Sequence, residues 1–393
     1  MKMKTFFWIS LFIVFYTYTG YGIVLYILVK IKEMLFSPDN AGISEMELPE
    51  VTLLIAAYNE ERIVDDKMAN CAELNYPAEK LKIVWITDGS TDKTNEKLAS
   101  YSNVLVYFEP KRGGKTAALN RAMKLVNTDI VIFTDANTML NQDAIKEIVL
   151  AFFNPEVGCV AGEKRIALDN TGNISSHGEG AYWRYESALK DLDSRLNTAV
   201  GAAGELFAVR KNLYEYVEED TLLDDFVISM RIAQKGFKIR YCKNAFAVES
   251  GSLNMAEEKK RKVRIAAGGI QSVIKLSSLL NIFKYPLLSF QYISHRVLRW
   301  TITPVLLFLL LPLNIILVIR EVYSIYTILL VLQIIFYLAS YTGSILEKKN
   351  IKINVFLIPY YFMFMNLNVF AGLLYLIKKK RGDGTWEKAK RAD

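Results

Sequence analysis

Long apolar stretches and short apolar runs divide the chain into two kinds of structure. Four stretches are nearly uncharged and close to the ~20 residues or more that a helix needs to cross a bilayer: 5–28, 297–319, 322–344 and 353–377. Residues 33–272 instead alternate short apolar runs with charged segments. This pattern predicts an N-terminal transmembrane anchor (1–32), one water-soluble domain (33–272) and about three C-terminal transmembrane helices (297–377).

Two shorter segments complete the predicted organisation. The first apolar stretch is too long for the core of a signal peptide and has no clear small-x-small cleavage site, which favours an uncleaved anchor. Residues 277–295 are apolar but are interrupted by Lys284, Pro286 and Gln291. Region 273–296 is therefore predicted to be an amphipathic segment at the membrane interface, and residues 378–393 to be a basic tail.

The soluble domain has the pattern of an α/β fold. Strands are expected at 51–57, 82–87, 104–108 and 130–133, with helices at 91–100, 115–126 and 143–153. Because strands and helices alternate with short connections, we expect a mostly parallel sheet covered by helices on both faces. A more mixed second half follows, with helices expected at 182–197, 224–234 and 257–275.

Composition and charge narrow the functional class. The chain has 393 residues, of which 52% are hydrophobic, and a net charge of +7. Much of the positive charge lies beside the apolar stretches, for example at Lys30, Lys32 and residues 378–381, which is typical of anionic membrane lipids and not of nucleic-acid binding. The three cysteines have no metal-like spacing and indicate a reduced, cytosolic domain.

Two carboxylates stand where predicted strands end. Asp88 and Asp135 each follow an apolar run, and residues 111–115 (Lys-Arg-Gly-Gly-Lys) lie between them in the sequence. Open α/β sheets bind ligands at this edge, and glycines with a helix start favour a phosphate. Each aspartate alone could simply cap the next helix. Together they favour a cleft for a nucleotide, a metal ion and phosphates.

Two further clusters begin or line predicted helices. Asp224 and Asp225 stand in a first turn, where acids usually complement the helix dipole, but adjacent carboxylates can also raise each other's pKa, as a general base requires. Arg261 and Arg264 share a helix face, and their planar forks suit a pyrophosphate. The alternative for this basic run is a solvated face, which we expect for Lys259–Lys260.

These motifs, taken in order, resemble the membrane-bound family 2 glycosyltransferases, the group of cellulose, chitin, hyaluronan and poly-N-acetylglucosamine synthases. The resemblance runs from about Val51 to Gly269, and the flanking apolar stretches agree with it. It is carried by the following segments: Ala57-Tyr58-Asn59-Glu60, Thr87-Asp88-Gly89-Ser90-Thr91-Asp92, Gly113-Gly114-Lys115, Phe133-Thr134-Asp135-Ala136-Asn137, Gly201-Ala202-Ala203-Gly204, Leu223-Asp224-Asp225 and 261–269.

The resemblance implies a GT-A fold that binds a nucleotide sugar, with a role for each motif. Tyr58, Glu60 and Asp88 would bind the nucleobase and ribose, Lys115 and Asp135 would complete the nucleotide site, and Asp135 with Asn137 would hold Mg²⁺ or Mn²⁺. Asp225, preceded by Asp224, would be the catalytic base, Gly201 to Gly204 the acceptor loop, and Arg261 and Arg264 the diphosphate-binding pair.

The sequence departs from the family pattern at three places. Asn137 replaces the second aspartate of the metal motif, giving a neutral and weaker ligand for a hard cation. Asp224 replaces a glutamate. Arg261 and Ile265 replace the glutamine and the tryptophan of the last motif, and loss of that tryptophan disfavours long-chain, cellulose-like synthesis.

The resemblance implies an inverting, multi-pass membrane glycosyltransferase with a cytosolic catalytic domain, at the cell membrane. It would transfer a sugar from a nucleotide sugar, with UDP as the expected nucleotide, to a growing polysaccharide or a lipid-linked glycan. Its partners would be the nucleotide sugar, the glycan or lipid-linked acceptor and membrane lipids, and not nucleic acid. Two alternatives stay open: a single addition onto a polyprenyl phosphate or glycolipid, and a non-catalytic membrane scaffold that retains the fold.

Overall fold

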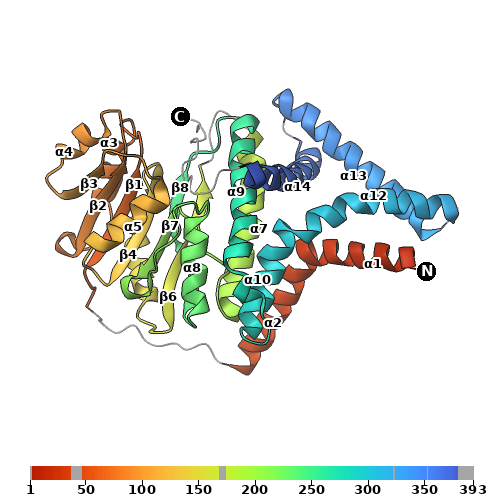
Figure 1. Ribbon diagram of the computed structural model, residues 1–393, viewed down its shortest axis with the longest axis horizontal. Coiled ribbons are helices and arrows are strands. Elements are labelled where there is room, and N and C mark those ends of the chain that lie inside the picture. The colour runs from red at the N-terminus through yellow and green to blue at the C-terminus, as the bar shows by residue number, and fades with distance from the viewer. Residues whose placement is uncertain (1, 37–46, 168–173, 322–323, 352, 379–393) are drawn as a thin grey trace.

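The structure, a computed structural model, describes residues 2–36, 47–167, 174–321, 324–351 and 353–378. Apart from Lys378, the predicted basic tail lies outside these residues. Strands and the shorter helices form one side of the molecule, and the long apolar helices extend from the other side (Figure 1). The active-site motifs belong to the first part, so its sheet is described first.

The predicted parallel sheet forms the first half of the sheet that the described residues build. Strands β1 (Val51–Ala57), β2 (Leu81–Asp88), β3 (Val104–Glu109) and β4 (Ile130–Asp135) lie in the order β3-β2-β1-β4, and all are parallel. Each of these strands was predicted within three residues of its observed ends. The predicted α/β fold with a mostly parallel first half is confirmed.

The second half of the sheet was missed by the hydrophobic pattern. Strands β7 (Leu206–Arg210), β6 (Val157–Ile166), β8 (Lys238–Glu249) and the short β5 (Thr138–Leu140) extend the order to β3-β2-β1-β4-β7-β6-β8-β5. Here β7 is antiparallel to both neighbours, while β6 and β8 are parallel. Strand β6 has register shifts against β8, and glycines, lysines and an asparagine interrupt the apolar runs of both strands, so neither gives a continuous signal.

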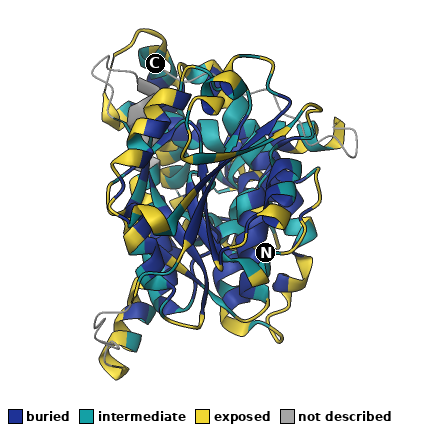
Figure 2. Ribbon diagram, turned by 90° about the vertical axis from the view of Figure 1, so that its left-hand side faces the viewer, coloured by how far each residue is buried: buried dark blue, intermediate teal, exposed yellow. Residues whose placement is uncertain are grey.

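Helices bury both faces of the sheet, which explains the unbroken apolar runs of the central strands. Leu54 and Phe133 belong to the core on the face of α5 (Lys115–Leu125) and α8 (Asp224–Gln234). Leu53 and Ile132 belong to the core on the face of α3 (Val64–Ala72), α4 (Thr94–Ala99) and α6 (Ala144–Ala151). The strands are accordingly buried between helices in Figure 2.

Four helical segments of the described residues are long and apolar enough to cross a membrane. The first, Lys2–Leu35, comprises α1 (Lys2–Phe15), a π-helical turn η1 (Tyr16–Gly20) and α2 (Tyr21–Leu35). The others are α12 (Ile302–Arg320), α13 (Ile325–Lys348) and α14 (Asn354–Lys378). Helices α1 and α2 run in different directions (Figure 1), as expected for a helix with a π-turn in it.

The two parts of the N-terminal helix have different partners. Phe7 of α1 packs with Leu310 and Leu317 of α12. Tyr21 and Leu25 of α2 instead pack with the long α7 (Ile174–Leu196) of the α/β part. The first apolar stretch therefore contacts both another candidate span and the soluble part.

The segment expected at the membrane interface is also packed against the α/β part. It contains η4 (Ser277–Leu280), α10 (Pro286–Tyr292), η5 (Ile293–Val297) and α11 (Leu298–Trp300). Leu279 and Tyr292 are fully buried in the core of α5 and α8, whereas Ile282 and Phe283 are 51% and 91% exposed. One side of the segment thus closes the protein core, and the other presents apolar side chains outward.

Helix α14 also contacts the α/β part, through α9 (Met255–Lys275). A Cβ atom on Gly372 would lie 2.7 Å from atoms of both Ala266 and Ala267, so the two helices meet almost backbone to backbone. The hydroxyl of Tyr361 on α14 donates a hydrogen bond to Glu258 Oε1 of α9 at 2.8 Å. These contacts fix the helix that carries Arg261 and Arg264.

The Tyr361 contact gives a stability prediction. We expect Tyr361→Phe to destabilise the protein by about 1 kcal/mol, because it removes one hydrogen bond while Glu258 keeps other partners. Ser252 Oγ and Lys262 Nζ lie 2.7 and 3.2 Å from the Glu258 carboxylate oxygens. Melting of the purified protein in nanodiscs measures the effect. The neighbouring Tyr360→Phe is the control, since the Tyr360 hydroxyl makes no hydrogen bond within the described residues. Equal shifts in both variants would contradict the assignment.

Candidate active site

A cleft of about 370 Å³ opens where the parallel strands β1, β2 and β4 end. Its shape depends on hydrogen bonds between the loops that follow β1 and β2. The Asn59 side-chain oxygen accepts from the Thr91 amide at 2.8 Å, and the Glu60 amide donates to Thr94 Oγ1 at 2.8 Å. These bonds position Tyr58 and Glu60, which both line the cleft.

Asp88 organises the glycine loop. Its Oδ2 atom accepts hydrogen bonds from the amides of Gly113 and Gly114 at 3.0 and 2.7 Å, and Asp88 is 4% exposed. The loop places the Arg112 guanidinium 3.9 Å from the centre of the Tyr58 ring. We expected the loop amides to favour a phosphate, but the carboxylate of Asp88 already uses these two. Arg112 and Lys115 are the cationic side chains that the loop brings to the cleft.

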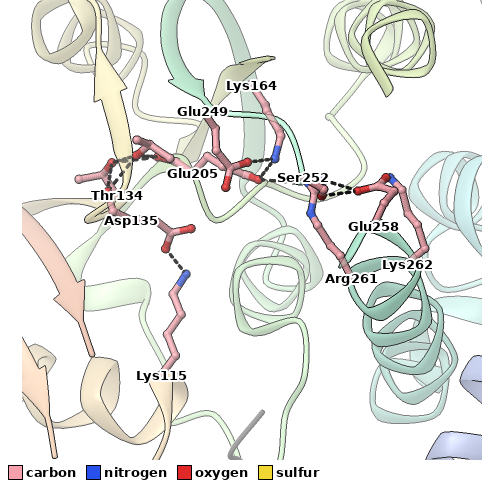
Figure 3. Close-up of polar contacts among 11 residues, drawn as sticks. Lys115, Thr134, Asp135, Lys164, Glu205, Glu249, Ser252, Glu258, Arg261 and Lys262 are labelled. Carbon is pink, nitrogen blue, oxygen red and sulfur yellow. Dashed lines mark hydrogen bonds and ion pairs between the residues drawn. The ribbon is translucent and has the colours of Figure 1, made fainter. Parts of the chain in front are cut away.

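Lys115 and Asp135 form an ion pair inside the cleft, with Nζ and Oδ1 2.6 Å apart (Figure 3). Lys115 begins α5, and Asp135 ends β4. Burial acts to lower the pKa of Lys115, but the carboxylates of Asp135, Asp224 and Asp225 outweigh burial and raise that pKa above its ordinary value. The lysine therefore carries its charge at every physiological pH.

Asp224 and Asp225 begin α8 and line the cleft. Asp225 Oδ1 accepts a hydrogen bond from the Phe226 amide at 2.8 Å. The pKa of Asp225 is raised to about 7. Burial is the largest cause, the charges of Asp224 and Glu205 add to it, and Lys115 partly offsets the increase. A carboxylate with a pKa near neutrality can accept a proton at the pH where the cell operates.

Arg261 and Arg264 reach the cleft from α9. Arg261 nitrogen atoms lie 3.8 Å from Glu205 Oε1 and 3.6 Å from Glu258 Oε2. Arg264 Nη2 donates to the Leu222 carbonyl at 3.5 Å. On the same helix Lys259 is exposed, and Lys260 pairs with Glu257. The two arginines thus occupy the cleft side of α9, separate from this pair of lysines.

A buried network that the sequence analysis missed supports Arg261. Lys164 of β6 is fully buried and pairs with both Glu205 and Glu249, and Glu205 is near Arg261 (Figure 3). Glu205 and Glu249 line the cleft. Lys164 stands between Glu163 and Arg165 in a strand that was not predicted, so no local pattern distinguished it from a surface lysine.

Other cleft residues were missed because no sequence pattern assigned a role to them. They are Arg112 of the glycine loop, Trp183 and Lys190 of α7, Arg296 of η5 and Trp300 of α11. Both η5 and α11 were assigned to the membrane interface or the first C-terminal span. Only their packing against the α/β part brings Arg296 and Trp300 to the cleft.

The two predicted acceptor-loop glycines have different places. Gly204 lines the cleft, and a Cβ atom there would lie 3.1 Å from Lys115 Nζ and 3.2 Å from Asp225 Oδ2. Gly201 is outside the lining. Its φ is +86°, and a Cβ atom would lie 2.2 Å from the Phe226 ring. Gly201 therefore makes room for Phe226. All the other predicted site residues, including Asn137, line the cleft.

The chemistry of the donors fits a hard divalent cation bound together with a phosphate ligand. No group of three or more histidine, cysteine, aspartate or glutamate side chains that could hold a metal occurs in the described parts of the chain. Asp135 and Asn137 nevertheless offer oxygen atoms on one side of the cleft. Mg²⁺ is commonly bound through one or two carboxylates plus substrate phosphates, so this small set is sufficient.

Comparison with known proteins defines the class of the α/β part. Residues 52–217 match the family described as glycosyl transferase family 2. This segment contains Asp88, Lys115 and Asp135. This part of the chain is therefore similar to the family 2 glycosyltransferases.

Curated relatives of this domain are polysaccharide and glycolipid synthases. The chain is 28% identical over 253 residues to a poly-beta-1,6-N-acetyl-D-glucosamine synthase of Staphylococcus aureus (strain COL), covering 61% of this chain and 60% of the relative. It is 27% identical over 241 residues to a beta-monoglucosyldiacylglycerol synthase of Synechocystis sp., covering 58% of this chain and 49% of the relative. The match thus spans three fifths or less of each relative's length.

A solved structure shares the fold over nearly the whole chain. The mannosyltransferase of Pyrobaculum calidifontis, determined in complex with GDP-Man and Mn²⁺, superposes with a TM-score of 0.68 at 20% sequence identity. The match covers 95% of this chain and 99% of the other. The GT-A-like fold with its attached apolar helices is therefore confirmed.

The position of Gly201 gives a prediction with a matched control. We expect Gly201→Ala to cost about 2–5 kcal/mol of stability, because it adds backbone strain at positive φ to a clash with Phe226. Gly236 also has a positive φ, of +94°, but nothing lies within 4 Å of a Cβ atom there. Gly236→Ala should cost only about 1–2 kcal/mol. Thermal melting separates the two, and a mild Gly201→Ala would contradict the proposed packing.

The raised pKa of Asp225 predicts a pH dependence of stability. Because the folded pKa of about 7 exceeds the ordinary value of 3.8, the native state binds the proton more tightly than the unfolded state. Stability from this group is therefore present at low pH and is lost as pH rises through about 7. We expect Asp225→Asn to melt higher than the wild type at pH 8 and to lose that advantage at pH 4. A constant difference would contradict the shift.

Proposed function

We propose that this protein is an inverting membrane glycosyltransferase that transfers a sugar from a nucleotide sugar to a hydroxyl group of a glycan or lipid-linked acceptor. The observation that carries the proposal is the cleft itself. It combines a carboxylate with a pKa of about 7, Asp225, with Lys115, Asp135, Arg261 and Arg264. A proton acceptor beside several cations suits a reaction in which a hydroxyl attacks and a diphosphate leaves.

The proposed reaction assigns one task to each group. Asp225 accepts the proton of the acceptor hydroxyl while the hydroxyl oxygen attacks the anomeric carbon. The bond from that carbon to the diphosphate breaks on the opposite face, so the configuration inverts. Arg261, Arg264 and Lys115 offset the negative charge that develops on the leaving diphosphate.

A divalent cation would assist the departure of the diphosphate by neutralising part of its charge. Asp135 and Asn137 are the residues that would hold it, and Asn137 would contribute a neutral and weaker oxygen ligand. The structure of the Pyrobaculum mannosyltransferase in complex with Mn²⁺ supports a divalent ion of this type, Mg²⁺ or Mn²⁺.

The nucleobase would lie near Tyr58, Glu60 and Asp88. The Arg112 guanidinium over the Tyr58 ring supports this placement, because the pair gives a planar, cationic surface at this end of the cleft. The family resemblance favours UDP, whereas the Pyrobaculum structure contains GDP-Man. The identity of the nucleobase is therefore part of the proposal to be tested.

The four candidate spans support membrane association, and we propose a multi-pass protein whose catalytic domain (33–272) faces the cytosol, where nucleotide sugars are made. Region 273–296 would lie at the membrane surface. The exposed Ile282 and Phe283 support this placement, since apolar side chains beside a lysine suit the headgroup boundary.

One observation favours a single addition over long-chain synthesis. Ile265, which replaces the family's tryptophan, lines the cleft. The relative from Synechocystis is named as a glycolipid synthase, which agrees with this second candidate. A non-catalytic scaffold is disfavoured, because it would not need Asp135, Lys115 and Asp225 in one cleft.

A nucleotide-release assay tests the proposal. Protein in nanodiscs is incubated with UDP-glucose, UDP-N-acetylglucosamine, UDP-galactose and GDP-mannose in Mg²⁺ or Mn²⁺, with membrane lipid extract as the acceptor source. We expect release of nucleotide from one of these donors, and loss of release in excess chelator. Asp225→Asn should reduce turnover by ~10²-fold or more while nucleotide binding persists, whereas Asp135→Ala should abolish metal-stimulated nucleotide binding.

Two results would contradict the proposal. Normal turnover in Asp225→Asn would show that another group is the base, with Asp224 tested next. Full activity in excess chelator would exclude the metal at Asp135 and Asn137. Lys259→Ala, on the exposed side of α9, is the control and should change neither binding nor turnover.

A further inference from the structure

Part of the cleft is formed by residues that the nucleotide-sugar site does not use. We call it the α7–α11 wall, defined by Trp183 and Lys190 of α7, Arg296 of η5 and Trp300 of α11. Helix α7 packs against α2, and α11 leads directly into α12. The wall is thus built on the elements that join the cleft to the candidate membrane helices.

Trp300 is held next to the catalytic base by a chain of close contacts. Its ring packs edge to face on Phe226, with ring centres 5.1 Å apart, and Phe226 directly follows Asp225. A Cβ atom on Gly269 would lie 2.4 Å from the indole, and the Arg296 guanidinium lies 5.6 Å from the centre of the Trp300 ring. Gly201 makes the corresponding room for Phe226. Trp300 is only partly buried, so indole surface remains available in the cleft.

Lys190 is the cation of this wall whose N–H groups can donate hydrogen bonds to a ligand. It is 4% exposed and lines the cleft, and its ammonium group has no hydrogen bond or ion pair within the described residues. Arg296, in contrast, is paired with Glu186. Burial lowers the pKa of Lys190, Arg296 lowers it further, and the carboxylates of Glu186, Glu205 and Asp225 oppose this change.

The charges around Lys190 indicate what kind of group it can bind. Glu186, Glu205 and Asp225 all act on the ammonium electrostatically. They would repel a second anion such as a phosphate, but they would not repel neutral hydroxyl groups. The ammonium group lies 5.8 Å from the centre of the Trp183 ring, but it has no hydrogen-bond acceptor within the described residues. A buried ammonium without an acceptor costs free energy, so hydroxyl oxygens of a ligand would be favourable partners.

We propose that the α7–α11 wall binds the sugar ring of a glycan or glycolipid acceptor. The apolar face of the ring lies on Trp300, ring hydroxyls accept hydrogen bonds from Lys190, and the attacking hydroxyl faces Asp225. The proposal rests on the glycosyltransferase function and adds the class of acceptor. It makes Trp300 a specificity-determining residue, one that is supplied by a segment outside the family 2 match.

The test compares acceptors with and without a sugar ring. The protein is held in nanodiscs, so that no solubilising glycoside detergent competes with the acceptor probes. The probes with a ring are octyl glycosides of glucose, N-acetylglucosamine and mannose, and those without are dioctanoylglycerol and farnesyl phosphate. We expect an octyl glycoside to be glycosylated. Trp300→Ala should raise the KM for that acceptor about tenfold or more, the effect of losing one good contact, with Trp300→Phe intermediate. Lys190→Gln should also raise it.

The KM for the nucleotide sugar should stay unchanged in both variants, because the wall lies outside the proposed nucleotide-sugar site. Trp8→Ala, a tryptophan change on α1, is the matched control. The proposal is overturned if Trp300→Ala leaves the acceptor KM unchanged, or if only dioctanoylglycerol or farnesyl phosphate is glycosylated. A wild type that releases no nucleotide from any donor would instead reject the glycosyltransferase function. Even then, quenching of tryptophan fluorescence by octyl glycosides tests the wall directly: we expect quenching in the wild type and clearly less in Trp300→Phe, with Trp183 left to report any remaining binding.

Discussion

Accumulated negative charge is the constraint on which this structure depends. Asp135, Asp224, Asp225 and Glu205 all line one cleft, where water screens their mutual repulsion less than at the surface. Lys115 balances this charge from one side, and the buried Lys164 from another. Burial of Asp225, together with the negative charges of Asp224 and Glu205 that Lys115 only partly offsets, raises the pKa of Asp225 to about 7. The proton affinity of Asp225 therefore depends on its burial and on the whole group of charges around it.

The part of this arrangement that follows the strand ends could be predicted from sequence. An apolar run that ends in a carboxylate marks a buried parallel strand and its functional edge, and this pattern located Asp88, Asp135 and the strands that carry them. The start of α8 could also be predicted, because two acids stand in the first turn of an otherwise apolar helix. Long apolar stretches likewise located the four candidate spans. In each case a local pattern of several residues carries the information.

The remainder depends on contacts between distant segments, and no local pattern encodes them. Polar residues interrupt strands β6 and β8, and the apolar run of β7 is only four residues long, so the second half of the sheet was missed. Arg296 and Trp300 lie in a segment whose apolar character predicted only a membrane surface or a membrane span. Gly201 belongs to a motif, but only the position of the Phe226 ring shows that the glycine provides space. Asp88 was assigned to the nucleotide, and the structure shows it bound to the glycine loop.

The contact between Gly372 and the alanines of α9 joins a candidate membrane span to the helix that carries Arg261 and Arg264. Because the two backbones nearly touch at this point, α14 cannot tilt toward α9 unless α9 moves with it. A membrane helix that is longer than the local hydrocarbon thickness can adapt by tilting. If α14 crosses a bilayer, as we propose, bilayers of different acyl-chain length would therefore shift the positions of the two arginines in the cleft.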